Sequence, residues 1–254
     1  MRILYLGDIV GEETVKLLAN NLEKIKQENK IHVAFANAEN VCGGKGLNFD
    51  YYKMLMKSGL SVLSMGNHTF SKFQIYDFID DANIVRPANL YNAPGKGYMT
   101  INYNNQKITV INLIGRVFMN NSADCPFRKM DEILENVQSD YYIVDFHAEA
   151  TSEKIALANY LDGRITAIVG THTHVQTADE RRLPKGTLAI TDLGMCGPIN
   201  SILGEEIEPI TDRFITGIYK PAKVASGVIM LNGVIIDTNT KRIERFHKEF
   251  IKEK

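Results

Sequence analysis

The feature that most restricts the fold of this chain is an alternation of short apolar runs with helical segments near the N-terminus. Residues 3–6, 33–36 and 62–65 form apolar runs that predict strands, and the segments 12–29 and 48–57 between them have helix-forming composition. A β-α-β-α-β order implies parallel strands joined by right-handed crossovers. We therefore expect the chain to begin as a parallel sheet covered by helices.

The middle and C-terminal parts of the chain add antiparallel strands. Two apolar runs, 98–103 and 108–111, flank a polar segment and predict a hairpin. Asn232-Gly233, in the middle of segment 228–237, is the strongest hairpin signal in the chain. Further predicted elements are strands at 142–146, 165–169 and 188–191, and a helix that starts near Thr151 and is stopped by Gly163.

This mixture of elements predicts one α/β domain that spans residues 1–254. Parallel strands followed by antiparallel ones fit a four-layer α+β arrangement, in which two mixed β-sheets pack face to face as a sandwich flanked by helices. The sequence shows no linker, internal repeat or low-complexity segment that would divide the chain.

The composition is that of an ordinary globular protein. The chain has 254 residues, of which 44% are hydrophobic and 23% are charged. No apolar run reaches the roughly 18 residues that a membrane span needs, and Asp8 makes the N-terminus acidic before a signal-peptide core could form. We therefore predict a cytoplasmic protein with no membrane partner.

Charge and cysteine content narrow the partners further. The formal net charge is −1, so the chain lacks the strongly basic character typical of nucleic-acid binding, and RNA as a partner is unsupported. A small phosphorylated substrate is compatible with this charge, because one site can be locally cationic. The three cysteines are far apart in the sequence, which argues against a disulfide framework and against a zinc–thiolate site.

Metal-capable side chains follow five of the predicted strands. In open α/β sheets the loops after the strands gather to form sites, so these residues should lie close together. The candidates, in chain order, are Asp8, Glu39, Asn40, Asn67, His68, His147, His172 and His174.

Each candidate motif also has a simpler explanation when it is taken alone. Asp8 could close a turn, Glu39 could do the same, and His147 could be a hydrogen-bonded core histidine. His172-Thr173-His174 is different, because alternate side chains of an extended segment share one face and both imidazoles can then point into one cavity. Taken together the motifs favour a metal centre. The remaining histidines, His32 and His247, are predicted to be structural or solvated.

The ligand types indicate which metals the site would hold. Oxygen and imidazole donors without thiolate suit iron or manganese, with zinc as an alternative, and not the all-oxygen cage that calcium prefers. Seven candidate ligands, the residues named above without His68, are too many for one tetrahedral ion but fit two ions that share a carboxylate, the usual arrangement for displacement at phosphorus. Two divalent ions bring +4, and Asp8 with Glu39 brings −2, so the centre would attract an anionic phosphate ester.

In this order along the chain, the motifs resemble the calcineurin-like metallophosphoesterases. Segments 144–151, 170–179 and 192–195 are similar to those of the YmdB-type bacterial group of 2′,3′-cyclic nucleotide phosphodiesterases. The resemblance implies that a hydroxide bridging the two metals attacks phosphorus while His68 acts as general acid. It implies that Asp8, Asn40 and His174 hold the first metal, that Asn67, His147 and His172 hold the second, and that Glu39 bridges them.

Two positions depart from the broad superfamily. Val10 stands where most members have a histidine after the first strand, and Glu39 stands where most have an aspartate. The longer Glu39 and the amide oxygen of Asn40 can compensate, and both substitutions look typical of the YmdB-type group. The coordination number of the first metal stays open.

Two other functions use the same residues. A phosphomonoesterase or nucleotidase would need the same metals and would differ in the shape of its pocket. A regulatory protein could bind a nucleotide or RNA and turn it over slowly. The cyclic nucleotide as substrate is implied by the resemblance alone, and the sequence leaves open whether the chain forms a homo-oligomer.

Overall fold

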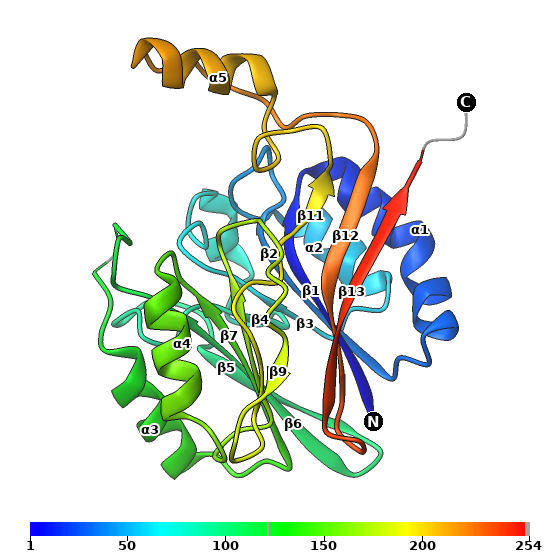
Figure 1. The fold of residues 1–254 in the computed structure, drawn as a ribbon, viewed down its shortest axis with the longest axis vertical. Helices are drawn as coiled ribbons and strands as arrows, with labels where there is room; N and C mark the ends of the chain where they lie inside the picture. The colour runs from blue at the N-terminus through cyan, green and yellow to red at the C-terminus, as the bar shows by residue number, and fades with distance from the viewer. Residues whose placement is uncertain (121, 252–254) are drawn as a thin grey trace.

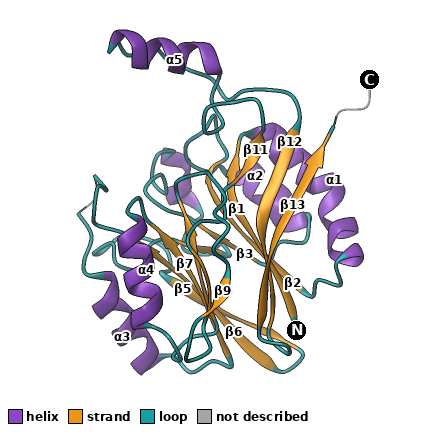
Figure 2. Cartoon of the chain, viewed as in Figure 1, coloured by secondary structure: helices purple, strands orange, loops and turns teal. Residues whose placement is uncertain are grey.

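The computed structural model describes residues 1–120 and 122–251 and has four layers in the order helix, sheet, sheet, helix (Figure 1). Helices α1 and α2 cover one sheet, helices α3 and α4 cover the other, and α5 stands apart from the sandwich (Figure 2). The predicted fold class is confirmed. The helices are α1 (Glu12–Glu28), α2 (Phe49–Lys57), the short 3-10 helix η1 (Phe73–Asp77), α3 (Pro126–Asn136), α4 (Thr151–Tyr160) and α5 (Ile207–Thr216).

The first sheet has seven strands in the order β13-β12-β11-β1-β2-β3-β4. Its strands are β1 (Arg2–Val10), β2 (Val33–Asn40), β3 (Val62–Ser64), β4 (Ile84–Val85), β11 (Met195–Pro198), β12 (Ile229–Asp237) and β13 (Arg242–Phe250). The pairs β1–β2, β2–β3 and β3–β4 are parallel, as the N-terminal alternation predicts. Strands β12 and β13 are antiparallel to their neighbours and make the sheet mixed.

The second sheet has six strands in the order β5-β6-β7-β8-β10-β9. Its strands are β5 (Tyr98–Tyr103), β6 (Gln106–Ile114), β7 (Tyr141–His147), β8 (Ala167–Thr171), β9 (Arg181–Arg182) and β10 (Leu188–Ile190). The central strands β6, β7, β8 and β10 are parallel, and antiparallel β5 and β9 form the two edges.

Three apolar layers stabilise this arrangement. Side chains from both sheets fill the space between them, among them Tyr5, Phe35 and Ile143. A second layer lies where α1 and α2 cover the first sheet, and a third where α3 and α4 cover the second. Helix α1 buries Leu18 and Leu22, whose spacing places them on one helical face, and each such side chain stabilises the fold by about 1.5–3 kcal/mol.

The hairpin predicted between residues 98 and 111 is confirmed, although its second strand begins earlier, at Gln106. Asn104 and Asn105 form its turn with positive φ angles of 48° and 62°. A two-residue turn of this kind needs positive φ at both positions, and asparagine tolerates it better than most residues.

The hairpin predicted at Asn232-Gly233 is wrong, because both residues lie inside the continuous strand β12. Position 233 has no room for a side chain, because strand β1 passes close by. A Cβ added to Gly233 would lie 2.2 Å from the Tyr5 carbonyl oxygen. The chain turns later, at residues 238–241, where the Asp237 carboxylate accepts two backbone N–H hydrogen bonds.

The mixed-charge C-terminal segment contains strand β13, which the sequence patterns did not predict. His247 lies in this strand with its Nδ1 2.7 Å from Asn232 Oδ1, and His32 accepts the backbone N–H of Arg2 at 3.0 Å. Both histidines thus have structural partners, as predicted.

The sequence patterns did not predict α3, α5, β4, β9 or β11. None of the helices in the described part of the chain combines the length and apolar character that crossing a bilayer demands.

Candidate metal centre

The carboxyl ends of parallel strands from both sheets meet at one edge of the sandwich, and the predicted site residues lie there. Asp8 belongs to β1, Glu39 to β2, and His147 is the last residue of β7. Asn67 follows β3, and His172 follows β8 directly. Strands β1 and β2 run further than predicted, so that Asp8 and Glu39 lie inside them. Their pairing shifts register on both sides of Asp8, and such irregularities re-aim side chains locally.

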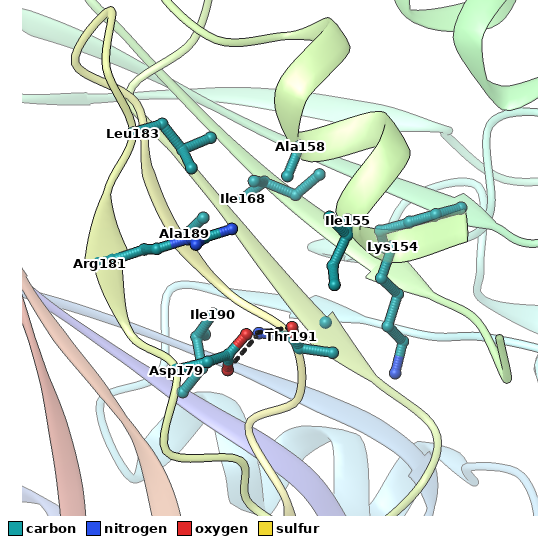
Figure 3. A pocket seen from close by; sticks show the side chains of 12 residues that line it. Lys154, Ile155, Ala158, Ile168, Asp179, Arg181, Leu183, Ala189, Ile190 and Thr191 are labelled. Atoms are coloured by element: carbon teal, nitrogen blue, oxygen red, sulfur yellow. Dashed lines mark hydrogen bonds between the residues drawn. The ribbon is translucent and has the colours of Figure 1, made fainter. Parts of the chain in front are cut away.

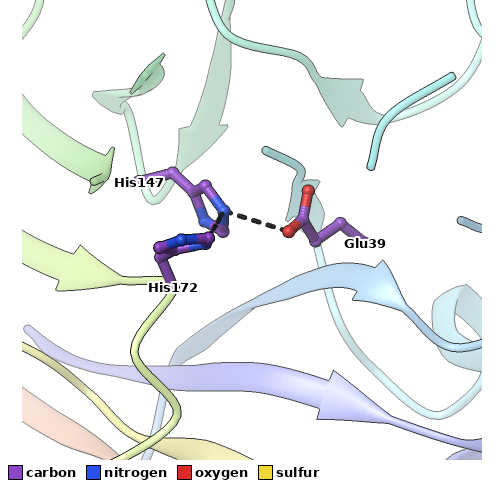
Figure 4. A group of neighbouring side chains, drawn as sticks. All are labelled: Glu39, His147 and His172. Carbon is purple, nitrogen blue, oxygen red and sulfur yellow. Dashed lines mark hydrogen bonds and ion pairs between the residues drawn. The ribbon is translucent and has the colours of Figure 1, made fainter. Parts of the chain in front are cut away.

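Four of these side chains converge on one point. The Nε2 atom of His147 lies 2.8 Å from Asn67 Oδ1, 3.0 Å from Glu39 Oε1 and 3.0 Å from His172 Nδ1. Figure 4 shows the two imidazole rings and the Glu39 carboxylate facing one another. Glu39 is 1% exposed and His147 is 0% exposed, whereas the His172 side chain is 24% exposed, so the cluster is buried on the Glu39 side and reaches solvent at His172.

Hydrogen bonding alone does not account for these four atoms. One ring nitrogen carries either one hydrogen or one lone pair, so it forms one such bond and not three. Two ligands that each lie about 2.0–2.2 Å from a shared ion are themselves about 3 Å apart at tetrahedral or octahedral angles. The observed spacing therefore fits one metal ion between the four atoms, and carboxylate, amide and imidazole donors suit iron, manganese or zinc.

A second group of candidate ligands lies beside the first. Asp8 Oδ1 is 4.0 Å from His174 Nε2 and 3.9 Å from His147 Nδ1. Asp8 Oδ1 and Asn40 Oδ1 are both buried acceptors with no hydrogen-bond partner among the described residues. A buried polar atom without a partner costs about 1–3 kcal/mol, and a bound cation would satisfy such an atom. These residues therefore fit a second ion.

The His172-Thr173-His174 segment reaches the site in a conformation different from the predicted one. The extended backbone is wrong: φ is 101° at His172 and 66° at His174, both in the left-handed region. Residues other than glycine adopt such angles at a cost of about 1–3 kcal/mol each, and they concentrate at functional sites. The turn directs His172 toward His147 and His174 toward Asp8, so the two imidazoles serve different groups of candidate ligands.

The buried charges are those expected of a cation-binding pocket. Burial raises the pKa of Asp8 to about 6. Burial acts to lower the pKa of His147, but Glu39 and Asp8 outweigh it and raise that pKa to about 9. Burial and the neighbouring His147 lower the pKa of His172 to about 3. The carboxylates thus favour positive charge in their midst, and His172 presents a neutral nitrogen, the form that binds metal.

His68 lies next to the four-atom cluster without joining it. Its backbone N–H donates to Glu39 Oε2 at 2.7 Å, and its ring Nδ1 lies 3.2 Å from the Ser71 hydroxyl. Burial lowers the pKa of His68, although Glu39 opposes the shift. In the tautomer in which Ser71 donates to Nδ1, the Nε2 of His68 carries a hydrogen that it can donate.

Comparison with known proteins identifies the family. Residues 4–249 match the family model described as YmdB-like protein. The chain belongs to the YmdB-like family. It is 46% identical over 259 residues to the 2′,3′-cyclic-nucleotide 2′-phosphodiesterase of Bacillus subtilis (strain 168), an alignment that covers 100% of this chain and 98% of that protein.

Two solved structures are similar to this YmdB-like chain over nearly its whole length. A hypothetical protein from Thermus thermophilus superposes with a TM-score of 0.93 at 39% identity and covers 98% of this chain and 99% of its own. A novel phosphatase of Mycoplasma pneumoniae superposes with a TM-score of 0.91 at 36% identity, with coverages of 99% and 93%. Three predictions from the sequence are confirmed: the family resemblance, the fold class, and the enzyme class, which is phosphoesterase.

Val10 is one of the two positions at which the sequence is expected to depart from the broad superfamily. The side chain is buried and packs against Gly204, where an added Cβ would lie 2.5 Å from a Val10 methyl carbon. An apolar side chain offers no ligand, so Asp8, Asn40 and His174 are the candidates on this side. Asn40 donates from Nδ2 to a backbone carbonyl at 2.9 Å, which leaves its Oδ1 for a cation.

Sequence reasoning missed a buried layer of residues beneath the ligands. The Thr171 hydroxyl donates to Asp145 Oδ1 at 2.7 Å and lies 2.9 Å from His147 Nδ1. The other Asp145 oxygen accepts from Ser64 and Asn37. Because the Thr171 hydrogen points to Asp145, its oxygen accepts from His147 Nδ1, and Nε2 is left as the ligand atom. The available signal was the spacing of Asp145 and His147, which places both on one face of β7.

A second supporting group, also missed, holds the turn that carries His172. Glu149 Oε2 lies 3.3 Å from His172 Nε2, which leaves Nδ1 of that ring for the cluster. Asp192 accepts from Lys154 Nζ at 2.7 Å and from the backbone N–H of Thr173 at 3.1 Å. The Lys154–Asp192 pair is buried, so its charges are fixed beneath the turn.

The hollow between α4 and strands β8 to β10 is not a substrate site. Its volume is about 20 Å³, room for little more than one water molecule. Figure 3 shows apolar side chains such as Ile155 and Leu183 on its two sides, with Lys154 at one end and Asp179 bonded to Thr191. The hollow therefore belongs to the packing of α4 on the sheet.

Proposed function

We propose that this chain is a two-metal phosphodiesterase that hydrolyses 2′,3′-cyclic nucleotides. The observation that carries the proposal is the convergence of three donor atoms on a fourth, His147 Nε2. The partnerless oxygens of Asp8 and Asn40 support it. The name of the Bacillus subtilis relative, aligned over the full chain, supports the cyclic-nucleotide substrate. We regard residues 1–254 as one catalytic domain.

The ligands divide into two groups that share one carboxylate. When bound, two transition-metal ions, iron or manganese or alternatively zinc, would neutralise charge on the phosphate group and lower the pKa of an attacking water molecule. The proposed ligands are Asp8, Asn40 and His174 for one ion, Asn67, His147 and His172 for the other, and Glu39 for both.

His68 is the proposed general acid. Its backbone N–H is tied to Glu39, while its ring lines the cavity at the mouth of the site together with Asn40 and His174. A hydrogen donated from Nε2 would stabilise the departing ribose oxygen as the cyclic ester opens to a nucleoside monophosphate. General acid catalysis of this kind contributes about 10²–10⁴-fold to the rate.

The test combines metal analysis with a substrate profile. Metal-saturated protein should contain about two transition-metal ions per chain, and it should hydrolyse a 2′,3′-cyclic nucleotide faster than a linear diester or a monoester. One ion per chain would overturn the two-metal assignment. A preference for the monoester would favour a phosphomonoesterase or nucleotidase, and filled sites with no turnover would favour a regulatory protein that binds nucleotide or RNA.

A further inference from the structure

A cavity of about 270 Å³ opens beside the candidate metal centre, and we name it the α5 cavity. Its inner end is lined by Asn40, His68 and His174. The remaining wall includes Ile202, Leu203 and Glu205 from the loop before α5 and Ile210, Arg213 and Phe214 from α5. The cavity is therefore continuous with the proposed catalytic residues. Its volume is close to the lower end of the range for small-molecule pockets, about 300–1,000 Å³, which suits one nucleoside.

The wall that α5 contributes consists of Ile210, Arg213 and Phe214, and most of the helix is exposed. Ile210 is the one α5 residue that is buried, and Phe214 is 82% exposed. Leu203, in the loop before the helix, is half exposed and lines the same cavity. Figure 1 shows α5 standing away from the sandwich, joined to it by loops at both ends. An exposed aromatic ring at the mouth of a polar site offers its face to a flat ligand.

Two cationic side chains complete the lining. Lys45 lines the cavity together with Asn40 and His68. Arg213 lies on α5, where its guanidinium donates to the Lys220 carbonyl at 2.7 Å and lies 4.6 Å from the Tyr219 ring centre. The Arg213 Nε is buried and has no hydrogen-bond partner in the described chain. The lining thus includes two cations, Lys45 and Arg213, one carboxylate, Glu205, and the exposed Phe214 ring.

We propose that the α5 cavity binds the nucleoside part of the substrate, with the base stacked on Phe214. The proposal rests on the phosphodiesterase function above and adds the element that recognises the substrate. With the phosphate at the inner end near Lys45, the ribose and base extend past Leu203 and Ile210 toward the Phe214 ring. Stacking on an aromatic ring tolerates every base. The α5 cavity therefore selects nucleotides over esters that lack a base, and it does not select one base over another.

The test compares two cyclic phosphodiesters, a 2′,3′-cyclic nucleotide and glycerol 1,2-cyclic phosphate, which has the same reacting ring and no base. Phe214→Ala should raise KM for the cyclic nucleotide about tenfold, within the range for loss of one base–aromatic stack. It should leave kcat/KM for the glycerol ester and the metal content as in the unchanged protein. Tyr91→Ala is the matched control, because Tyr91 is 78% exposed and lines a different hollow that includes none of the site residues.

Direct binding separates failure of this proposal from failure of the proposed function. Calorimetry should show that Phe214→Ala weakens binding of adenosine 3′-monophosphate but not of inorganic phosphate, whether or not the protein turns over a cyclic ester. Equal effects on both ligands, or on neither, would overturn the nucleoside site. If Phe214→Ala changed the molar mass measured by light scattering and lost equal activity on both substrates, α5 would be a contact between copies of the chain. That result would also overturn the nucleoside site.

Discussion

Replacement of Thr171 by valine tests whether the hydroxyl beneath His147 supports metal binding. Thr171 is fully buried at the end of β8, and valine has nearly the same shape, so the change removes a hydroxyl without opening a large cavity. It removes two contacts at once, the hydrogen bond to Asp145 Oδ1 at 2.7 Å and the contact with His147 Nδ1 at 2.9 Å.

The structure sets the size of the expected effect. Asp145 keeps Ser64 and Asn37 on its other oxygen, so its Oδ1 is left without a partner, as is His147 Nδ1. Each buried group left unsatisfied costs about 1–3 kcal/mol, so the free energy of unfolding should fall by about 2–6 kcal/mol. Loss of the outer partner of a ligating histidine also weakens metal affinity, typically by about 10–100-fold.

Thr109→Val provides the matched control. Thr109 is equally buried, lies in β6 of the same sheet, and shares a hydrogen bond of 2.8 Å with Thr100 away from the site. Urea unfolding of the metal-free variants gives their stabilities, and competition with a chromogenic chelator gives their metal affinities. Both variants should be less stable, and Thr171→Val alone should bind metal more weakly. Equal metal affinity in the two variants would refute a supporting role for the Thr171 hydroxyl.

Three further predictions follow from the site. His68→Ala should keep both metals and lose roughly 10²–10⁴-fold in turnover. The loss should be smaller for a nitrophenyl diester, whose leaving group needs little protonation. Loss of metal from this variant would show that His68 is a ligand. Lys154→Met leaves the buried Asp192 charge without its ion partner and should lower the unfolding free energy by about 3–5 kcal/mol in urea; an unchanged midpoint would contradict this. His172→Ala and His174→Ala should each empty a different ion site in anomalous scattering, and loss of the same ion from both would show that the two groups are misassigned.

The sequence predicted the elements whose cause is local. The parallel half of the first sheet follows from apolar runs separated by amphipathic helices, and the candidate ligands could be found because polar residues such as Asp8 and Glu39 interrupt buried strands near their ends. The order of the motifs then suffices to bring them to one edge, because parallel strands end on the same side.

Elements determined by tertiary contacts could not be predicted in this way. Asn232-Gly233 has the composition of a turn, but the close approach of β1 determines its conformation. The left-handed backbone at His172 has no local signal in the sequence, because its cause is distant contacts. The Asp8 carboxylate accepts the His172 N–H at 3.3 Å, and the Asp192 carboxylate accepts the N–H of Thr173. Helix α5 was also missed, although Ile207, Ile210 and Phe214 recur at helical spacing and so gave a local signal.

Gly66 is a further case in which a tertiary contact explains a residue, and it gives a last prediction. An added Cβ at Gly66 would lie 2.4 Å from the ring of His147, and its φ is not in the left-handed region, so the ring is the obstacle to a side chain. To reach ordinary contact at 3.4 Å the ring must move by about 1 Å (3.4 − 2.4), whereas metal–ligand distances tolerate only about 0.2 Å.

Gly66→Ala should therefore weaken binding of the ion held by His147. The ion on the His174 side should stay bound. Gly97→Ala is the matched control, because its added Cβ would lie 2.6 Å from Ala88, a comparable overlap that involves no site residue. Both variants should lose stability in urea, since overpacking of a filled interior costs about 1–3 kcal/mol. Chelator competition should then show a loss of metal affinity in Gly66→Ala alone. If Gly66→Ala binds both ions as tightly as Gly97→Ala, the His147 ring does not hold a metal in the position that the structure gives it.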